Sequence, residues 1–185
     1  MTATIENERA PAPSPKLALA AFRELHARRL HGFALLLALG DRASAARLAA
    51  DALTAAGPRL EGLRHPERAA AWLRQHVLKH ANGAGRRDRP VDPHVLADLG
   101  ADAAVVAGLA LLAPRERAAL IVSAIERFDR RDVATIVGRD GSSLDRLLRR
   151  ARQRYVAGYI TVTPEAVVDG PVAARLRGVA QSVLS

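Results

Sequence analysis

Apolar residues recur along this chain at intervals of three and four, and no segment alternates apolar and polar residues with the period of two that strands require. Leu144, Leu147, Leu148, Ala151 and Tyr155 show the pattern clearly, because these positions fall on one face of a helix. Hydrophobic residues make up 49% of the sequence but aromatic residues only 3%, which favours close helix packing over a sheet held by aromatic pairs. We therefore expect an all-α fold.

Glycine, proline and charged residues divide the chain into two small helical domains joined by a linker. The stretch NGAGRRDRPVDP lacks apolar periodicity and is the natural boundary, and short helices are expected from His94 onward. The expected divisions are a disordered leader over residues 1–16, a first helical domain over 17–82, a linker over 83–104, a helix-turn-helix domain over 105–160, and a tail over 161–185 that adds a short helix.

The stretch RRDVATIVGRDGSSLDRLLRRARQRY, residues 130–155, predicts two helices joined by a sharp turn. Gly138 permits the left-handed backbone that such a turn demands, and Ala134, four residues earlier, is small enough to let two helices approach closely. We expect the second helix to begin near Ser142, whose hydroxyl would cap it, with Asp145 three residues on. This spacing matches a helix-turn-helix.

The charge of the chain is strongly basic and almost entirely arginine. The formal net charge is +9, and Lys16 and Lys79 are the only lysines. Arginine suits phosphate, because its planar fork donates two hydrogen bonds to one anionic group. Residues 127–154 hold nine arginines against four acids, enough to neutralise several phosphates. A basic face can also serve only to keep a helix soluble, but its coincidence with the hinge and the cap favours DNA binding.

Residues 112–155 resemble the C-terminal promoter-reading domain of extracytoplasmic-function sigma factors of bacterial RNA polymerase. The positions in register are Leu112, Pro114, Arg117, Leu120, Glu126, Val133, Ala134, Gly138, Ser143, Leu148, Arg150, Ala151 and Arg152. The segments AFRELHARRLHGF, GDRASAARLAADAL and AAAWLRQHVLKHA are similar to the family's N-terminal domain, which binds the polymerase clamp and melts the promoter. The resemblance thus extends over residues 20–158.

The resemblance implies a transcription initiation protein that binds core RNA polymerase and directs it to promoter DNA, with an anti-sigma factor as a further partner. The DNA-binding residues it implies are Arg130, Arg131, Ser142, Ser143, Arg146, Arg149, Arg150 and Arg152. Arg146 and Arg149 are the candidates for base edges, and the other arginines for phosphates. It implies polymerase contacts by Arg47, Leu48 and Asp51, and promoter melting by Trp72 and Lys79. Trp72 also fits the alternative role of a core aromatic residue.

The sequence departs from the family at positions that bear on function. Ala46 and Arg47 replace an acidic pair of the clamp-binding helix, and Ala50 replaces a glutamine. Asp145 stands where lysine is usual, either orienting Arg149 or accepting from a cytosine amino group. Two alternatives therefore stay open: a helix-turn-helix regulator that has lost polymerase docking, and a protein-interaction module whose arginines meet an acidic surface.

Other classes of function find little support. The chain has no cysteine, so disulfides and thiolate metal sites are excluded. His76 and His80 lie four apart, but no third ligand completes a metal motif. No nucleophile elbow or phosphate-binding glycine loop is present, so we expect no enzymatic activity, cofactor or small-molecule substrate. The run GFALLLALG is too short to span a bilayer, so we expect a soluble cytoplasmic protein without membrane contact.

Overall fold

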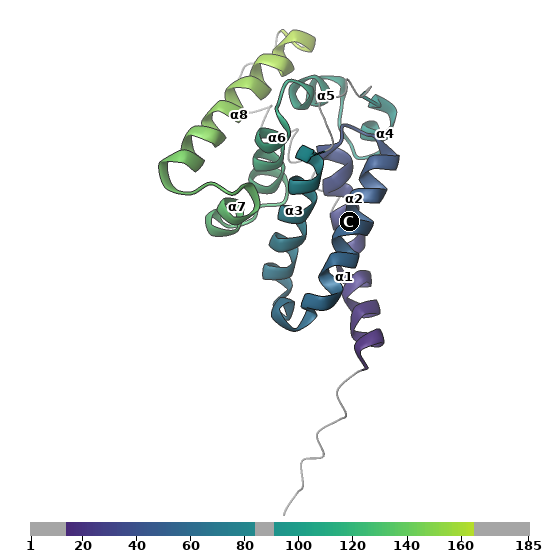
Figure 1. The fold of residues 1–185 in the computed structure, drawn as a ribbon. Coiled ribbons are helices and arrows are strands. Elements are labelled where there is room, and N and C mark those ends of the chain that lie inside the picture. Colours follow the sequence, from purple (N-terminus) through teal and green to yellow (C-terminus); the bar gives the residue numbers. More distant parts are fainter. Residues whose placement is uncertain (1–13, 84–90, 165–185) are drawn as a thin grey trace, which may run out of the picture.

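The computed structural model describes residues 14–83 and 91–164, and within these ranges it contains helices and no strand. Three long helices lie side by side in the first unit (Figure 1). The elements of this unit are α1 (Pro15–Leu37), α2 (Arg42–Ala56), the short 3₁₀ helix η1 (Gly57–Leu63) and α3 (Pro66–Gly83). The all-α expectation is confirmed.

The second unit begins with two short helices and ends with the long helix α8, which lies on the far side of the molecule from α1 (Figure 1). Its elements are α4 (Pro93–Ala97), α5 (Ala103–Ala110), α6 (Pro114–Leu120), the π-helical turn η2 (Ile121–Ile125), α7 (Arg130–Val137) and α8 (Gly141–Val162). None of the helices in the described ranges combines the length and the apolar character needed to cross a membrane.

Local chemistry sets most helix ends. The Asp41 carboxylate accepts a hydrogen bond from the Ser44 amide at 2.9 Å and so caps α2. Ser14 caps α1, which therefore begins at Pro15 and takes in the last two residues of the expected leader. The rest of that leader, residues 1–13, and the tail helix expected near 172–183 lie outside the described residues.

Residues 84–90 of the expected linker lie outside the described ranges, and Gly83, its first residue, ends α3. From Val91 onward the chain is fixed in place by hydrogen bonds of Asp92. The Asp92 amide donates to the Leu39 carbonyl at 3.0 Å, and the Asp92 carboxylate caps α4 by accepting from the amides of His94 and Val95. The start of the second unit is thus tied to the end of α1.

Helices α5 and α8 cross very closely because each has a glycine at the contact. A Cβ at Gly108 would lie 2.6 Å from the Tyr155 ring, and one at Gly158 would lie 2.6 Å from the Ala107 carbonyl oxygen. No larger residue fits either position without a backbone shift. Leu144, Ala151 and Tyr155 of the apolar stripe of α8 are buried, as the sequence predicts, and Leu147 and Leu148 are partly buried.

The two units pack against each other along a seam, with α3 on one side and α6 and α7 on the other. At its centre the Arg74 guanidinium and the Glu126 carboxylate form a two-point ion pair, one contact of which, from Nε to Oε2, is 2.6 Å. The Arg74 guanidinium also lies over the rings of Phe33 and Phe128, at 5.7 and 4.8 Å from their centroids. Both charges are therefore compensated within a buried contact.

A second buried arginine fixes the same arrangement from the other end. The Arg117 guanidinium donates to the carbonyls of Leu37, Leu109 and Leu112, so it connects the end of α1 with the loop after α5. Burial lowers the pKa of Arg117 to about 10, which leaves it charged at neutral pH. The buried residues of both units consequently form one continuous hydrophobic core rather than two separate ones.

Candidate nucleic-acid interface

Helices α7 and α8 form the expected helix-turn-helix. Gly138 ends α7 with φ 62° and ψ 44°, the left-handed conformation that the sequence analysis assigns to it. Asp129 caps α7 by accepting from the Asp132 amide at 2.7 Å. Val133, Ile136 and Val137 are buried, so the apolar face of α7 packs inward as predicted.

The predicted cap of α8 is wrong. The helix begins at Gly141, with Asp140 at its N-cap and no side-chain capping hydrogen bond, so Ser142 lies one position inside the helix and is exposed. The extended Asp140 backbone allows its carbonyl to accept from the amides of Ser143 and Leu144, both at 3.0 Å. Backbone geometry, rather than the Ser142 hydroxyl, starts this helix.

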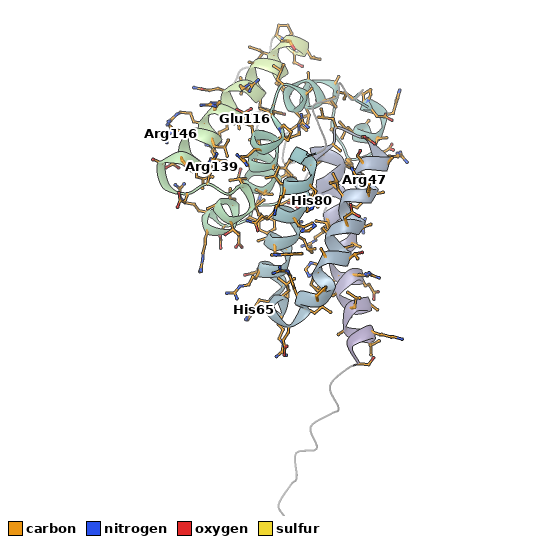
Figure 2. All side chains as sticks on the ribbon, in the orientation of Figure 1. Arg47, His65, His80, Glu116, Arg139 and Arg146 are labelled. Atoms are coloured by element: carbon orange, nitrogen blue, oxygen red, sulfur yellow. The ribbon has the colours of Figure 1, made fainter. Side chains whose placement is uncertain are left out.

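Four arginines form the outward surface of α8, which we call the basic face: Arg146, Arg149, Arg150 and Arg152. All four are exposed, and within the described ranges none forms an ion pair or a hydrogen bond. Figure 2 shows Arg146 on the outer side of α8, away from the first unit. Arg131 of α7 and Arg139 of the turn are also exposed. The basic face is therefore free to meet an anionic partner.

Arg130 has a different position from the other predicted DNA contacts. Its guanidinium pairs with the Asp145 carboxylate at 2.8 Å and so joins the start of α7 to the first turns of α8. The hydrogen bond between them raises the pKa of Arg130 and lowers the pKa of Asp145. Asp145 thus takes Arg130 as its hydrogen-bonded partner, while the charge of Arg149 contributes to the lowered pKa of Asp145. The exposed pair keeps the acid from projecting alone into the basic face.

Arg154 also belongs to the fold rather than to the basic face. Its guanidinium donates to the Glu116 carboxylate at 2.9 Å, and the Glu116 side chain is only 6% exposed. The same carboxylate accepts from the Ala113 amide at 3.0 Å, at the start of α6. Glu116 therefore anchors α8 to α6.

The residues predicted to bind polymerase are divided between surface and core. Arg47 and Asp51 are exposed on α2 and pair with each other at 3.6 Å. Leu48, by contrast, is 2% exposed, so a direct contact between Leu48 and a partner is a prediction that this structure contradicts. Its position among the buried residues of the three-helix unit makes it a core residue that holds α2 in place.

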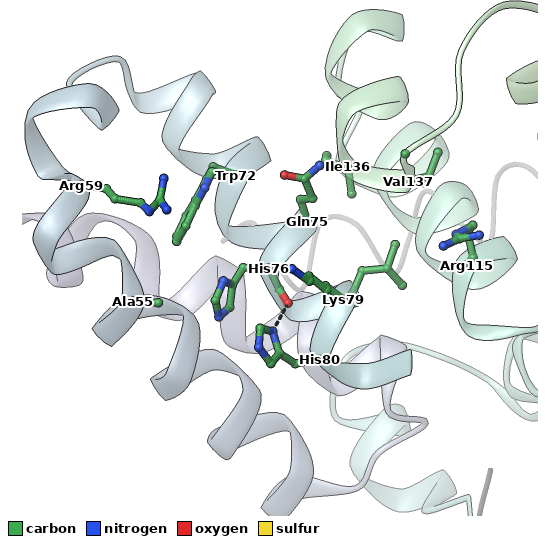
Figure 3. A pocket seen from close by; sticks show the side chains of 12 residues that line it. Ala55, Arg59, Trp72, Gln75, His76, Lys79, His80, Arg115, Ile136 and Val137 are labelled. Carbon is green, nitrogen blue, oxygen red and sulfur yellow. Dashed lines mark hydrogen bonds between the residues drawn. The ribbon is translucent and has the colours of Figure 1, made fainter. Parts of the chain in front are cut away.

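Trp72 and Lys79, the predicted melting residues, lie on α3 and line one hollow with the helix-turn-helix (Figure 3). Trp72 is half-buried and Lys79 is exposed, while Val137 and Gly138 form part of the opposite wall. The arginines of the basic face do not line this hollow. The structure thus places both residues of the predicted melting pair in the lining of one hollow, and the basic face lies elsewhere.

Sequence reasoning missed the seam. Arg74 lies four residues before Leu78 and four after Ala70, so a charged residue interrupts the apolar stripe of α3, and that interruption is the signal that indicates a buried partner. Gln75 adds a further contact, since its side-chain amide donates to the Thr135 carbonyl of α7 at 2.8 Å. No sequence signal indicates that contact, because an exposed glutamine is compatible with many surroundings.

The helix-turn-helix with its basic face lies inside a region that is similar to a known family. Residues 109–154 match the sigma-like domain of the response regulator PhyR. This sigma-like region runs from the end of α5 into α8 and includes α7, the turn and the part of α8 that carries the basic face. No curated protein and no solved structure matches the chain significantly. The match supports the sigma-like character that the sequence analysis inferred, over less than half of the chain.

Proposed function

We propose that this protein is a sigma-factor-like regulator of transcription that binds promoter DNA through the basic face of α8 and core RNA polymerase through its first unit. The observation that carries the proposal is the basic face itself. Four exposed arginines, unpaired within the described residues, lie on the second helix of a helix-turn-helix within a sigma-like region. A recognition helix of this kind enters the major groove, where arginine reads guanine and grips phosphate.

The arginines divide into two roles by their place on α8. Arg146 and Arg149 lie nearest the start of the helix, which is the end that approaches base edges in helix-turn-helix proteins. Arg150 and Arg152, together with Arg131 of α7, are the proposed phosphate contacts. Arg130 is paired with Asp145, so its proposed contribution is to position the turn rather than to bind phosphate alone.

The DNA proposal is tested by selecting duplexes from a random library with the full chain and then comparing two variants on selected and unrelated DNA. We expect Arg149→Ala to relax preference at one base pair by about 1–3 kcal/mol. Arg152→Ala should weaken all duplexes similarly and reduce the salt dependence of binding. Arg64→Ala, which removes an exposed arginine directly after η1, is the matched control. Equal losses for Arg149→Ala on both kinds of DNA would exclude base readout.

Polymerase binding needs a test of its own, because Ala46, Arg47 and Ala50 of α2 differ from the residues that are usual in the sigma-factor family. The exposed Arg47 and Asp51 pair with each other, so the surface of α2 offers few free charges for an electrostatic fit. A pull-down of purified core polymerase, followed by transcription from a genomic promoter library, measures the activity directly. Stable binding with selective initiation supports a sigma factor, and DNA binding without polymerase supports a helix-turn-helix regulator.

A second candidate function is that of a sigma-like protein that acts on a protein partner such as an anti-sigma factor. Two observations favour it: the matched family is named for a response regulator rather than for a sigma factor, and the seam packs the two units together. A rigid, closed surface suits protein recognition, since the partner need not order it. Absence of salt-dependent DNA binding by the folded chain would favour this function over the first.

A further inference from the structure

The hollow beneath Trp72 has the size and the composition of a ligand site. Its volume is about 780 Å³, within the range of about 300–1,000 Å³ that small-molecule sites occupy. Its walls come from the end of α2 and η1, from α3, and across the seam from α6 and α7. Figure 3 shows the side chains of Trp72, His76 and His80 following one another along α3. Both units therefore build the hollow.

The charges that line the hollow are all basic. Arg59, Lys79 and Arg115 contribute permanent cations, His76 and His80 contribute imidazoles, and no carboxylate lines the walls. Within the described ranges none of the three permanent cations forms an ion pair. A carboxylate that affects the hollow from outside the lining is that of Asp51, which pairs with Arg47 and opposes the lowering of the His76 pKa by burial. Cations that no lining carboxylate neutralises attract an anion, and a phosphate offers both lysine and arginine suitable acceptors.

The rings along α3 add a second kind of recognition. The Trp72 and His76 rings lie 5.2 Å apart between centroids, and the His76 and His80 rings stack at 4.1 Å with an interplanar angle of 26°. The Arg59 guanidinium lies 5.8 Å above the indole centroid. Arg59 is exposed, so it is free to move toward an anion and leave the indole face to a planar group.

We propose that this hollow binds a free nucleoside polyphosphate, with the base against the Trp72 indole face that Arg59 leaves open and the phosphates held by Lys79 and Arg115. An aromatic ring stacks against a planar base, and cations without a paired carboxylate bind a polyphosphate. A nucleoside polyphosphate carries both groups in one molecule. Because α3 and α7 both line the site, the ligand binds the closed arrangement of the two units and stabilises it. The nucleotide thereby acts on the helix-turn-helix, a role that does not depend on whether the basic face binds DNA.

The indole of Trp72 gives a direct measurement, because it is the only tryptophan in the sequence. The full chain is titrated with ATP while the tryptophan emission is followed at red-edge excitation, and the same titration is repeated by calorimetry. We expect saturable binding, with Lys79→Ala and Arg115→Ala each weakening it by about tenfold, equivalent to about 1.4 kcal/mol. Arg64→Ala removes an exposed arginine that lies outside both the hollow and the basic face, and it is expected to leave binding unchanged. Loss of binding in Arg146→Ala would instead place ATP on the basic face.

Three comparisons decide between this ligand and its rivals. If inorganic pyrophosphate binds as tightly as ATP, the rings add nothing to the affinity, and the assignment of a nucleotide is overturned. If the protein binds a single-stranded oligothymidine but not ATP, and Lys79→Ala weakens that binding, the ligand of the hollow is melted DNA rather than a nucleotide. Trp72→Leu, measured by calorimetry, is expected to weaken ATP and spare pyrophosphate. No saturable binding of ATP, or equal loss in Arg146→Ala, would also refute the proposal.

Discussion

Arg74 and Glu126 face each other inside the seam with only 4% and 3% of their side-chain surface exposed. Removing one partner of such a pair leaves the other charge buried without compensation. We expect Glu126→Ala to lower the free energy of unfolding by about 3–5 kcal/mol, measured by urea denaturation. The matched control is Arg64→Ala, which breaks the exposed Arg64–Glu61 pair and should cost less than about 1 kcal/mol.

The double variant Arg74→Met/Glu126→Leu separates the charge effect from loss of packing. Replacing both members of a buried pair by apolar residues is often neutral, so most of the stability lost in Glu126→Ala should return. A loss below about 1 kcal/mol for Glu126→Ala would mean that water reaches the pair in solution and that the seam is not closed there.

His26 makes the stability of the fold depend on pH. It is 8% exposed, and its pKa is lowered by burial, then by the charges of Arg74 and Arg29. Below the unfolded pKa of about 6.5, His26 therefore takes up a proton more readily in the unfolded chain than in the folded chain. Its contribution to the free energy of unfolding is complete above that pH and is lost as the pH falls toward the lowered folded pKa. We expect a lower melting temperature at about pH 5.5 than at pH 7.5.

The variant His26→Gln should reduce this dependence on pH, because glutamine does not titrate in that range. His76, whose pKa is also lowered chiefly by burial, contributes with the same sign, so part of the dependence should remain. His94→Gln changes an exposed histidine of α4 and is the control. An unchanged difference between the two pH values in His26→Gln would show that His26 does not contribute to it.

At the scale of single residues, the sequence predicts what local chemistry decides. The left-handed Gly138 and the buried stripe of α8 follow from neighbours within a few positions. The partner of Arg74 lies 52 residues away, and the partner of Asp145 belongs to another helix, so periodicity within one helix does not identify either. Leu48 was misassigned for the same reason: a family position gives a role, but burial depends on the packing of the whole unit.

At the scale of elements, the sequence predicts the two helices on either side of Gly138, but not every helix end, since the cap expected at Ser142 lies inside α8. Local chemistry sets both ends of α2, since Asp41 caps its start and Gly57-Pro58 follows its end. The π-helical turn η2 and the positive φ of 56° at Arg127 had no sequence signal. They allow Glu126 and Phe128 to flank Arg74, so the seam rather than local preference accounts for them.

The crossing of α5 and α8 gives a prediction for Gly158. An alanine there would place its Cβ 2.6 Å from the Ala107 carbonyl oxygen, and a backbone atom cannot rotate away as a side chain can. We expect Gly158→Ala to destabilise the fold by about 1–3 kcal/mol in urea denaturation, although alanine favours helices by up to about 1 kcal/mol over glycine. Gly62→Ala is the control, because nothing lies within 4 Å of its added Cβ. A stabilised Gly158→Ala would mean that the two helices are further apart.

At the scale of the molecule, the packing of the two units is the feature that the sequence did not predict. A stretch rich in glycine, proline and charge predicts a linker, and a linker alone leaves the relative placement of its neighbours open. Long-range contacts decide it: the Arg74–Glu126 pair, the hydrogen bonds of Arg117 and the contact of Gln75 with Thr135. The hollow beneath Trp72 exists only in this packing, whereas the basic face lies on the outside of it.

The closed packing leads to a final prediction about DNA binding. The sequence has no cysteine, so Gln75→Cys/Thr135→Cys introduces the only two thiols, at exposed positions that touch across the seam. We expect a short bismaleimide to join them in the free protein, and we expect no such product from His65→Cys/Arg146→Cys, whose positions lie far apart in Figure 2. Because the basic face points away from the seam, the cross-linked protein should bind duplex DNA within about threefold of the unlinked variant, a difference below about 1 kcal/mol. Loss of DNA binding on cross-linking, with the fold intact by circular dichroism, would instead mean that the two units must separate before α8 reaches the groove.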